Sequence, residues 1–209
     1  MKRSTLIVLK TLTWLACLAP AAWLAWAAVT NTLGPDPTAE IASVTGLSAL
    51  WMLAITLAIS PLRRLLPQQL NWLIKFRRLI GLFVFFYGTL HMLTYVALYA
   101  GFDLGVMKTD ITKRRFIIAG VTTYLLLLPL ALTSTTWAIR KLGGKNWNRL
   151  HTLIYPAAIA ATIHYWWKVK TGVLSPAPFT LVLFVLLAAR PVLAWLQKRK
   201  ARTAVAASR

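Results

Sequence analysis

The chain has 209 residues, of which 58% are hydrophobic, and it carries 24 lysines and arginines against only four aspartates and glutamates. This composition excludes both an ordinary soluble domain and a disordered chain. The net charge of +20 would suit nucleic acid, but the basic residues form short clusters between apolar runs of about 20 residues, without a base-stacking motif. We therefore predict an all-α integral membrane protein that does not bind nucleic acid.

The first predicted span covers residues 11–29 and follows Lys2, Arg3 and Lys10. A charged start before an apolar run also resembles a signal peptide, with the stretch WAA as its cleavage site. The run is long and the following chain stays apolar, so we expect this helix to be retained. The next segment, NTLGPDPTAE, contains two prolines that should stop a helix.

Five more spans are predicted along a single domain that covers residues 1–209. Their lengths suit a hydrocarbon core of about 30 Å at 1.5 Å per helical residue. The glycine-containing segment RKLGGKNWNR and the terminal QKRKARTAVAASR are predicted to lie outside the spans, as a loop and a polar tail. The single cysteine, Cys17, allows no intramolecular disulfide, CxxC pair or CxxCH attachment of haem. The five spans are residues 41–62, 79–100, 116–136, 151–168 and 179–195.

The distribution of charge predicts the orientation of this six-transmembrane-helix bundle. With both termini in the cytoplasm, seventeen lysines and arginines lie inside and six lie outside, while Arg190 falls within the last span. Cytoplasmic loops usually carry such an excess of positive charge. The exception is the segment 108–115, whose basic residues would lie outside, where they suit either lipid headgroups or an acidic periplasmic partner.

All three histidines lie within or at the edge of a predicted span. His91 lies in the third span, and His151 and His164 lie near the two ends of the segment RLHTLIYPAAIAATIHYWWK. Ionisable side chains at membrane depth usually face the bundle interior and mark a relay, an ion path or a cofactor. Because imidazole commonly ligates haem iron, the pattern favours a b-type haem. The competing interpretation is that these histidines bond across helices without any cofactor.

Depth in the membrane predicts which histidines meet. His91 lies about 18 Å along the span that begins at residue 79, and His164 lies about 20 Å beyond His151. Both helices enter from the cytoplasm, so His91 and His164 should share one height in the outer half of the membrane. We predict this pair as the axial ligands. His151, near the cytoplasmic edge, would ligate a second haem, line a quinol or flavin site, or join an interfacial hydrogen-bond network.

Several motifs resemble the MsrQ family, also called YedZ, within the ferric-reductase-like transmembrane group. They are GPDP in the first loop, RRLIGL before the third span, TLHMLTY around His91 and LALTST at the end of the fourth span. The most specific is KLGGKNWNRLHTLIYPAAIAATIHYWWKVK. The resemblance spans almost the whole chain. The family resemblance implies a six-helix fold in which His91, His151 and His164 are the haem-associated positions.

The same resemblance implies the cofactors and partners. It suggests haem b and FMN, a multi-pass location in the bacterial inner membrane, and electrons supplied by the quinone pool or by a cytosolic flavin reductase. The acceptor would be a periplasmic molybdenum-cofactor subunit, bound as a heterodimer, which reduces methionine sulfoxide in oxidised proteins. An FMN phosphate would need basic residues such as those in segments 75–78 and 140–149, although these are better explained as topology signals.

The chain is expected to be an electron carrier with no complete catalytic site of its own. It contains no strand-flanked GxGxxG motif, and about 14 residues follow the last span, far fewer than a dinucleotide-binding domain needs. Two other functions remain open. One is a transporter that uses the histidines as a proton relay, and the other is a non-catalytic membrane anchor for a periplasmic enzyme.

Overall fold

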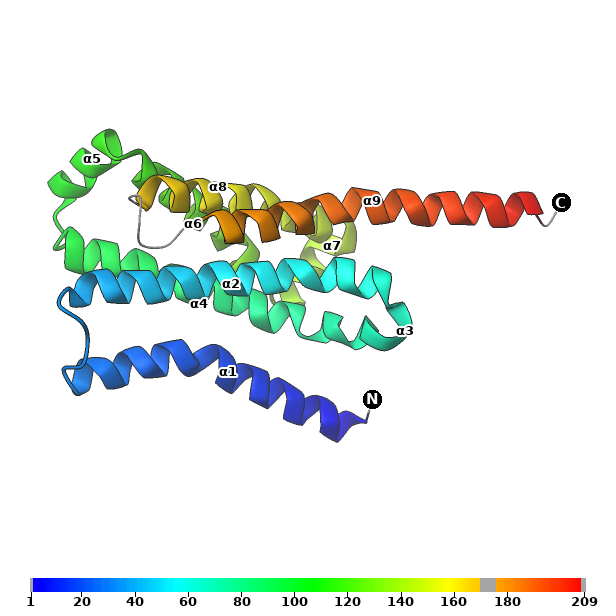
Figure 1. Cartoon of the computed structure of the whole chain (residues 1–209), viewed down its shortest axis with the longest axis horizontal. Coiled ribbons are helices and arrows are strands. Elements are labelled where there is room, and N and C mark those ends of the chain that lie inside the picture. Colours follow the sequence, from blue (N-terminus) through cyan, green and yellow to red (C-terminus); the bar gives the residue numbers. More distant parts are fainter. Residues whose placement is uncertain (1, 170–175, 208–209) are drawn as a thin grey trace.

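The computed structural model describes residues 2–169 and 176–207, and every regular element in those residues is helical, as predicted. The long helices run roughly parallel to one axis and form an elongated bundle (Figure 1). In chain order the elements are α1 (Arg3–Val29), α2 (Pro37–Leu65), α3 (Pro67–Leu70), the 3₁₀-helix η1 (Asn71–Lys75), α4 (Arg77–Leu93), the π-helix η2 (Thr94–Tyr99), α5 (Leu104–Lys113), α6 (Arg115–Leu132), α7 (Thr136–Leu150), the 3₁₀-helix η3 (His151–Leu153), α8 (Ile154–Lys168) and α9 (Ala177–Ala207).

Within the described residues, five helical segments are long and apolar enough to cross a membrane. They are α1, α2, α4 with its continuation η2, α6 and the stretch Ala177–Arg199 of α9. The remaining predicted span, the fifth in chain order, corresponds to α8, which has 15 residues. At 1.5 Å per residue α8 is about 22 Å long, shorter than a hydrocarbon core of about 30 Å.

The prediction for the first loop needs a correction, because Pro37 begins a helix instead of stopping one. A proline is favourable at the first helical position, where its missing N–H has no helical partner to lose. The Asp36 carboxylate caps the same end and accepts a hydrogen bond from the Ala39 amide at 2.9 Å. The sequence DP therefore starts α2 four residues earlier than predicted.

Two predicted non-helical segments also prove to be largely helical. The segment predicted as a basic loop forms α7, although Gly143 breaks its helical geometry with φ 74° and ψ 148°. The predicted polar tail continues α9 as far as Ala207. The segment after the third span contains α5, which Asp103 caps by accepting hydrogen bonds from the Gly105 and Val106 amides at 2.6 and 3.1 Å. Local capping and helix continuation thus outweigh the polar composition.

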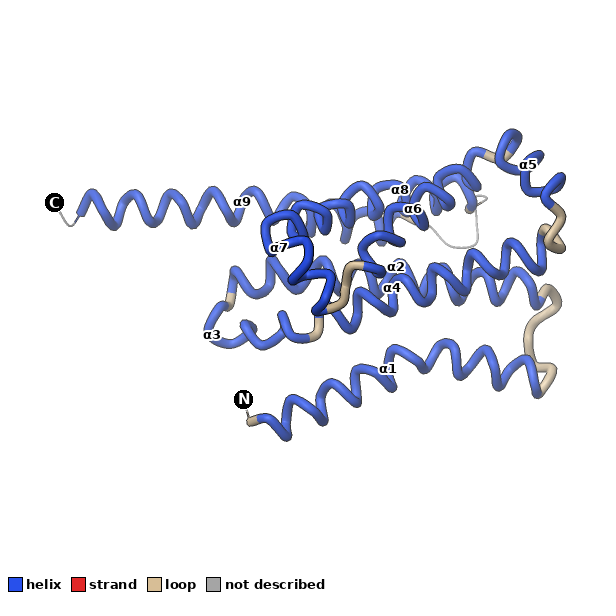
Figure 2. Tube along the Cα trace, turned by 180° about the vertical axis from the view of Figure 1, so that it is seen from behind, coloured by secondary structure: helices blue, strands red, loops and turns tan. Residues whose placement is uncertain are grey.

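Two helix pairs build the centre of the bundle: α2 packs along α4, and α6 packs along α8, while α9 covers α2. The α2 and α4 faces meet through the buried side chains of Leu53, Leu57 and Val84. On α8 the buried Ala157 and Ala158 have no exposed surface, and small side chains of this kind allow helices in membranes to approach closely. Both termini lie at the end of the bundle that holds α3 and α7, and α5 lies at the other end (Figures 1 and 2).

A tyrosine on α4 fastens α1 to the bundle. The Tyr87 hydroxyl donates to the Cys17 carbonyl at 2.7 Å and accepts from the Ala21 amide at 3.1 Å. These two backbone groups would bond to each other in a regular helix, so the hydroxyl has entered the hydrogen-bond ladder of α1 beside Pro20. Tyr87 itself has no exposed surface.

Replacing Tyr87 with phenylalanine is expected to loosen α1. The buried amide and carbonyl of α1 lose their partner, at a cost of about 1–2 kcal/mol in the free energy of unfolding. The measurement is the thermal unfolding of detergent-solubilised protein, followed by circular dichroism. The matched control is Tyr124→Phe, because the Tyr124 hydroxyl makes a longer contact, 3.3 Å, with Thr89. Equal midpoints for the two variants would contradict this role of Tyr87.

Candidate functional site

The structure brings together two of the three predicted histidines. His91 on α4 and His164 on α8 face each other with ring centres 5.8 Å apart and ring planes at 87°. This agrees with the expectation that both residues lie at one height in the bundle. Their role as iron ligands stays a prediction. The π-helix η2 begins three residues after His91, and π-turns within membrane or soluble helices frequently mark functional sites.

A backbone carbonyl of a neighbouring helix orients each ring. The Nδ1 of His91 lies 2.9 Å from the Ala42 carbonyl on α2, and the Nδ1 of His164 lies 2.7 Å from the Phe116 carbonyl on α6. A carbonyl oxygen only accepts hydrogen bonds, so each Nδ1 must donate. In a neutral imidazole the Nε2 atom then carries the free lone pair, which is the form that binds a metal.

Each histidine ring also lies against a glycine. A Cβ atom built on Gly46 of α2 would lie 3.1 Å from Nδ1 and Cε1 of His91. A Cβ atom on Gly120 of α6 would lie 2.8 Å from Nδ1 and 3.0 Å from Cε1 of His164. The position at Gly120 is too close for a Cβ atom unless the ring shifts, and at Gly46 the ring would have to move by a few tenths of an ångström. The two glycines thus provide the space that the rings occupy. The sequence offers no signal for these contacts, because they join residues on different helices.

These residues fit the axial ligands of a haem. A metal bonded at about 2 Å to one nitrogen of each ring would hold the ring centres about 6 Å apart, close to the observed separation. Two imidazoles supply two ligands, and a porphyrin supplies the other four. The pair is also surrounded by apolar helices, as a haem requires. The donor set, its tautomer and its spacing therefore agree with a low-polarity site for haem b.

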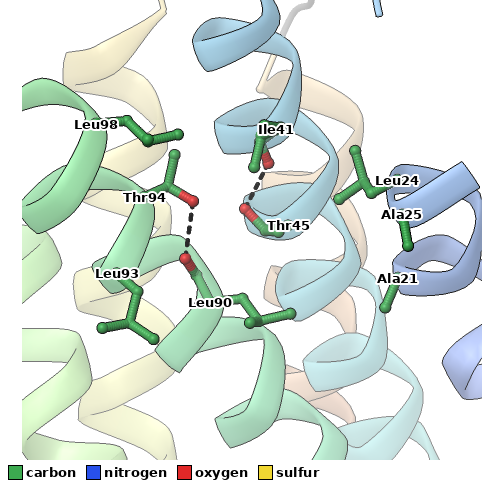
Figure 3. A pocket seen from close by; sticks show the side chains of 9 residues that line it. All are labelled: Ala21, Leu24, Ala25, Ile41, Thr45, Leu90, Leu93, Thr94 and Leu98. Carbon is green, nitrogen blue, oxygen red and sulfur yellow. Dashed lines mark hydrogen bonds between the residues drawn. The ribbon is translucent and has the colours of Figure 1, made fainter. Parts of the chain in front are cut away.

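A small cavity lies between α1, α2, α4 and η2 (Figure 3). It has a volume of about 350 Å³, and its lining is apolar except for two threonines. Thr45 and Thr94 each donate to a carbonyl of their own helix, at 2.7 and 2.8 Å. The Thr45 hydroxyl oxygen also lies 3.4 Å from Nδ1 of His91. Thr45 therefore places a second oxygen, in addition to the Ala42 carbonyl, next to Nδ1 of His91.

His151 lies apart from the pair. It begins η3, and 13 residues, or about 20 Å of helix, separate it from His164. Its ring stacks on Trp147 at 3.8 Å between centres, and its Nδ1 donates to the Trp147 carbonyl at 3.0 Å. The indole N–H of Trp147 in turn donates to the Thr133 carbonyl at 2.9 Å. His151 is thus oriented as firmly as the other two histidines.

The Nε2 atom of His151 is buried and has no hydrogen-bond partner among the described residues. An unpaired buried nitrogen is costly unless a ligand uses it. The three interpretations of His151 from the sequence, a second haem, a quinol or flavin site and an interfacial hydrogen-bond network, all stay predictions.

Arg190 is a functional candidate that the sequence left unassigned. Its guanidinium donates to the Tyr155 hydroxyl at 2.6 Å and to the Leu57 carbonyl at 2.7 Å, and it lies 4.9 Å from the centre of the Tyr155 ring. It therefore joins α9 to α8 and α2. Its Nε atom is buried without a partner among the described residues. The signal in the sequence was an arginine inside a predicted span, where an ionisable residue usually has a specific role.

The comparisons with known proteins point to one group. The sequence model of the family described as "Ferric reductase like transmembrane component" matches residues 39–162, which include His91 and His151. The chain is 44% identical over 207 residues to the "Protein-methionine-sulfoxide reductase heme-binding subunit MsrQ" of Xanthomonas oryzae pv. oryzae (strain MAFF 311018), covering 96% of this chain and 92% of that protein. The protein of the same name from Herminiimonas arsenicoxydans is 42% identical over 203 residues, with the same coverage. That from Xanthomonas axonopodis pv. citri (strain 306) is 45% identical over 191 residues, covering 88% of this chain and 86% of the relative.

Proposed function

The chain belongs to the MsrQ family, within the ferric-reductase-like transmembrane group, and from this premise we propose that it is a membrane cytochrome b. It carries electrons through the bacterial inner membrane to a periplasmic methionine sulfoxide reductase that repairs oxidised proteins. The observation that supports this function best is the pair of His91 and His164, with their rings 5.8 Å apart and both Nε2 atoms left free by hydrogen bonds at Nδ1.

The residues around the pair suit such a carrier. When bound there, haem b supplies an iron that takes up and releases one electron at a time. The carbonyls of Ala42 and Phe116 hold both rings in the neutral, metal-binding tautomer. Apolar side chains on the surrounding helices exclude water and keep the local dielectric low. The protein therefore contributes ligand orientation and environment, and these set the potential of a bound haem.

The charge distribution supports the orientation in this proposal. The end of the bundle that holds α3, α7 and both termini carries most of the basic residues, and by the positive-inside rule this end faces the cytoplasm (Figure 1). All four acidic residues lie toward the opposite end, near the start of α2 and around α5. In this orientation α8, extended by η3, is the fifth span and α9 is the sixth. The His91–His164 pair then lies toward the periplasm, and His151 lies toward the cytoplasm.

This arrangement defines a direction for electron flow. Electrons enter near His151 from a quinol or from a cytosolic flavin reductase, and leave near the outer pair. FMN is a further cofactor of the proposal, with His151 at one candidate site. On the outer side, α5 and the residues that follow it present Lys108, Lys113, Arg114 and Arg115 to an acidic periplasmic partner that carries the molybdenum cofactor.

The test is electron transfer through the purified protein in liposomes. A membrane-permeant quinol should reduce the haem, and the periplasmic reductase with methionine sulfoxide should then reoxidise it. Omitting the sulfoxide should prevent reoxidation. A colourless protein would favour the proton-relay transporter. Full sulfoxide reduction with His91→Ala would favour the non-catalytic anchor, because an anchor needs no haem ligand.

A further inference from the structure

We propose that the groove between α1 and the start of α4 is a binding site for an anionic phospholipid. The groove has a volume of about 640 Å³ and lies at the end of the bundle that holds the basic clusters. Its rim carries three cationic side chains, namely Lys10 of α1, Lys75 at the end of η1 and Arg78 in the first turn of α4. This inference is independent of the haem site and of the electron donor.

Charge favours a phosphate group at the rim. The four acidic residues of the chain are Asp36, Glu40, Asp103 and Asp110, and all lie toward the other end of the bundle. The ion pair found among the described residues joins Arg114 to Asp110, at that other end. The three rim cations therefore have no carboxylate close by. A phosphodiester neutralises such a cluster, and an arginine side chain can bind it with two parallel hydrogen bonds.

The depth of the groove favours a lipid over a free anion. Each rim cation has an apolar partner four residues further along the chain, namely Trp14 after Lys10, Leu79 after Lys75 and Leu82 after Arg78. For the pairs within α1 and within α4, four residues correspond to about 6 Å of axial rise on nearly the same face. The groove therefore changes from cationic to apolar in one helical turn, as the headgroup and acyl chains of a phospholipid require. Basic pockets of this kind between membrane helices bind anionic lipid headgroups.

The position of α1 indicates what such a lipid does. This helix lies at the edge of the bundle in both views (Figures 1 and 2). Its hydrogen bonds to α4 pass through Tyr87, more than two helical turns deeper than Lys10. A phosphate held by Lys10, Lys75 and Arg78 bridges the two helices at the membrane surface. The lipid therefore fastens the end of α1 that Tyr87 leaves free.

Native mass spectrometry of the delipidated, full-length protein tests this site. Phosphatidylglycerol is titrated in one series and phosphatidylcholine in another, and the fraction of protein that retains lipid is measured. The groove variant is Lys10→Gln/Lys75→Gln/Arg78→Gln. The control is Arg140→Gln/Lys141→Gln/Lys145→Gln on α7, which removes the same three charges at the same end of the bundle but away from the groove.

We expect the groove variant to bind phosphatidylglycerol at least five-fold more weakly than wild type, and the control to remain within two-fold. Equal loss in both variants would overturn the site in favour of diffuse surface charge. Equal binding of phosphatidylcholine would also overturn it. Displacement of phosphatidylglycerol by millimolar FMN or inorganic phosphate would mean that the rim binds a free anion. If the triple variant does not fold, the single variant Lys10→Gln tests the site instead. We expect it to bind phosphatidylglycerol at least two-fold more weakly than wild type.

Discussion

We expect His91→Ala and His164→Ala to lose the haem of the facing pair, and His151→Ala to retain it. Each of the first two changes removes one of the facing imidazoles, and a haem held by a single axial ligand between two apolar helices is lost or becomes high-spin. His151 lies about 20 Å along the helix from His164 and cannot replace either ligand. The measurement is the reduced-minus-oxidised absorption spectrum, with pyridine-haemochrome quantitation per mole of purified protein.

The three alanine variants serve as controls for one another, because each removes one imidazole from a helical position. Circular dichroism and gel filtration of each variant establish that the bundle is intact. If His151→Ala also lowers the haem content, by about half, a second haem lies near the cytoplasmic face, as the unpaired Nε2 of His151 allows. Loss of haem from His91→Ala and His151→Ala, with full retention in His164→Ala, would contradict the observed pairing.

A single methyl group at Gly120 should disturb the haem site almost as strongly as the loss of a ligand. The new Cβ atom would lie 2.8 Å from Nδ1 of His164, closer than real contacts allow. The ring cannot retreat without breaking its hydrogen bond to the Phe116 carbonyl, which lies four residues before Gly120 on the same helix. We expect Gly120→Ala to lose more than half of its haem and to shift the absorption of the remainder.

The matched control for this experiment is Gly88→Ala. Gly88 lies on α4, three residues before His91, and a Cβ atom there would meet Leu127 at an ordinary distance of 3.9 Å. Gly46→Ala, with contacts of 3.1 Å to His91, should give an intermediate effect. The haem content is expected to be highest in Gly88→Ala, lower in Gly46→Ala and lowest in Gly120→Ala. A full haem complement in Gly120→Ala would show that the ring does not need the position seen in the structure.

The meeting of His91 and His164 could be predicted because helical rise is nearly constant. Counting residues from the membrane entry of each helix gives the height of a side chain, even when the helix ends are wrong by a few residues. In this chain α4 begins at Arg77 instead of residue 79, which changes the height of His91 by about 3 Å. That error is too small to separate the two rings or to bring His151 to their height.

The helical parts of the polar segments could not be predicted in the same way. The α7 segment contains two adjacent glycines and four basic residues, and the end of α9 is rich in lysine and arginine. Such compositions are typical of loops as well as of exposed helix ends, so hydrophobic periodicity does not separate the two. In the structure Thr135 caps the start of α7 by accepting a hydrogen bond from the Ala138 amide, and Trp147 bonds to the Thr133 carbonyl at the end of α6. Composition reveals neither this local cap nor the contact with α6.

The sequence by itself determined the properties that depend only on the residues within each segment. These are the all-helical membrane class, the approximate span positions, the excess of basic residues at one end and the height of each histidine. They follow locally, because a segment in lipid must satisfy its own backbone hydrogen bonds and hide its polar groups. Only the tertiary structure decided the rotation of each helix about its axis. That rotation directs the carbonyls of Ala42 and Phe116 at the two histidine rings and places Gly46 and Gly120 against the same rings. It also brings the Tyr87 hydroxyl into α1. The sequence of one segment cannot reveal these contacts, because they join groups from different helices.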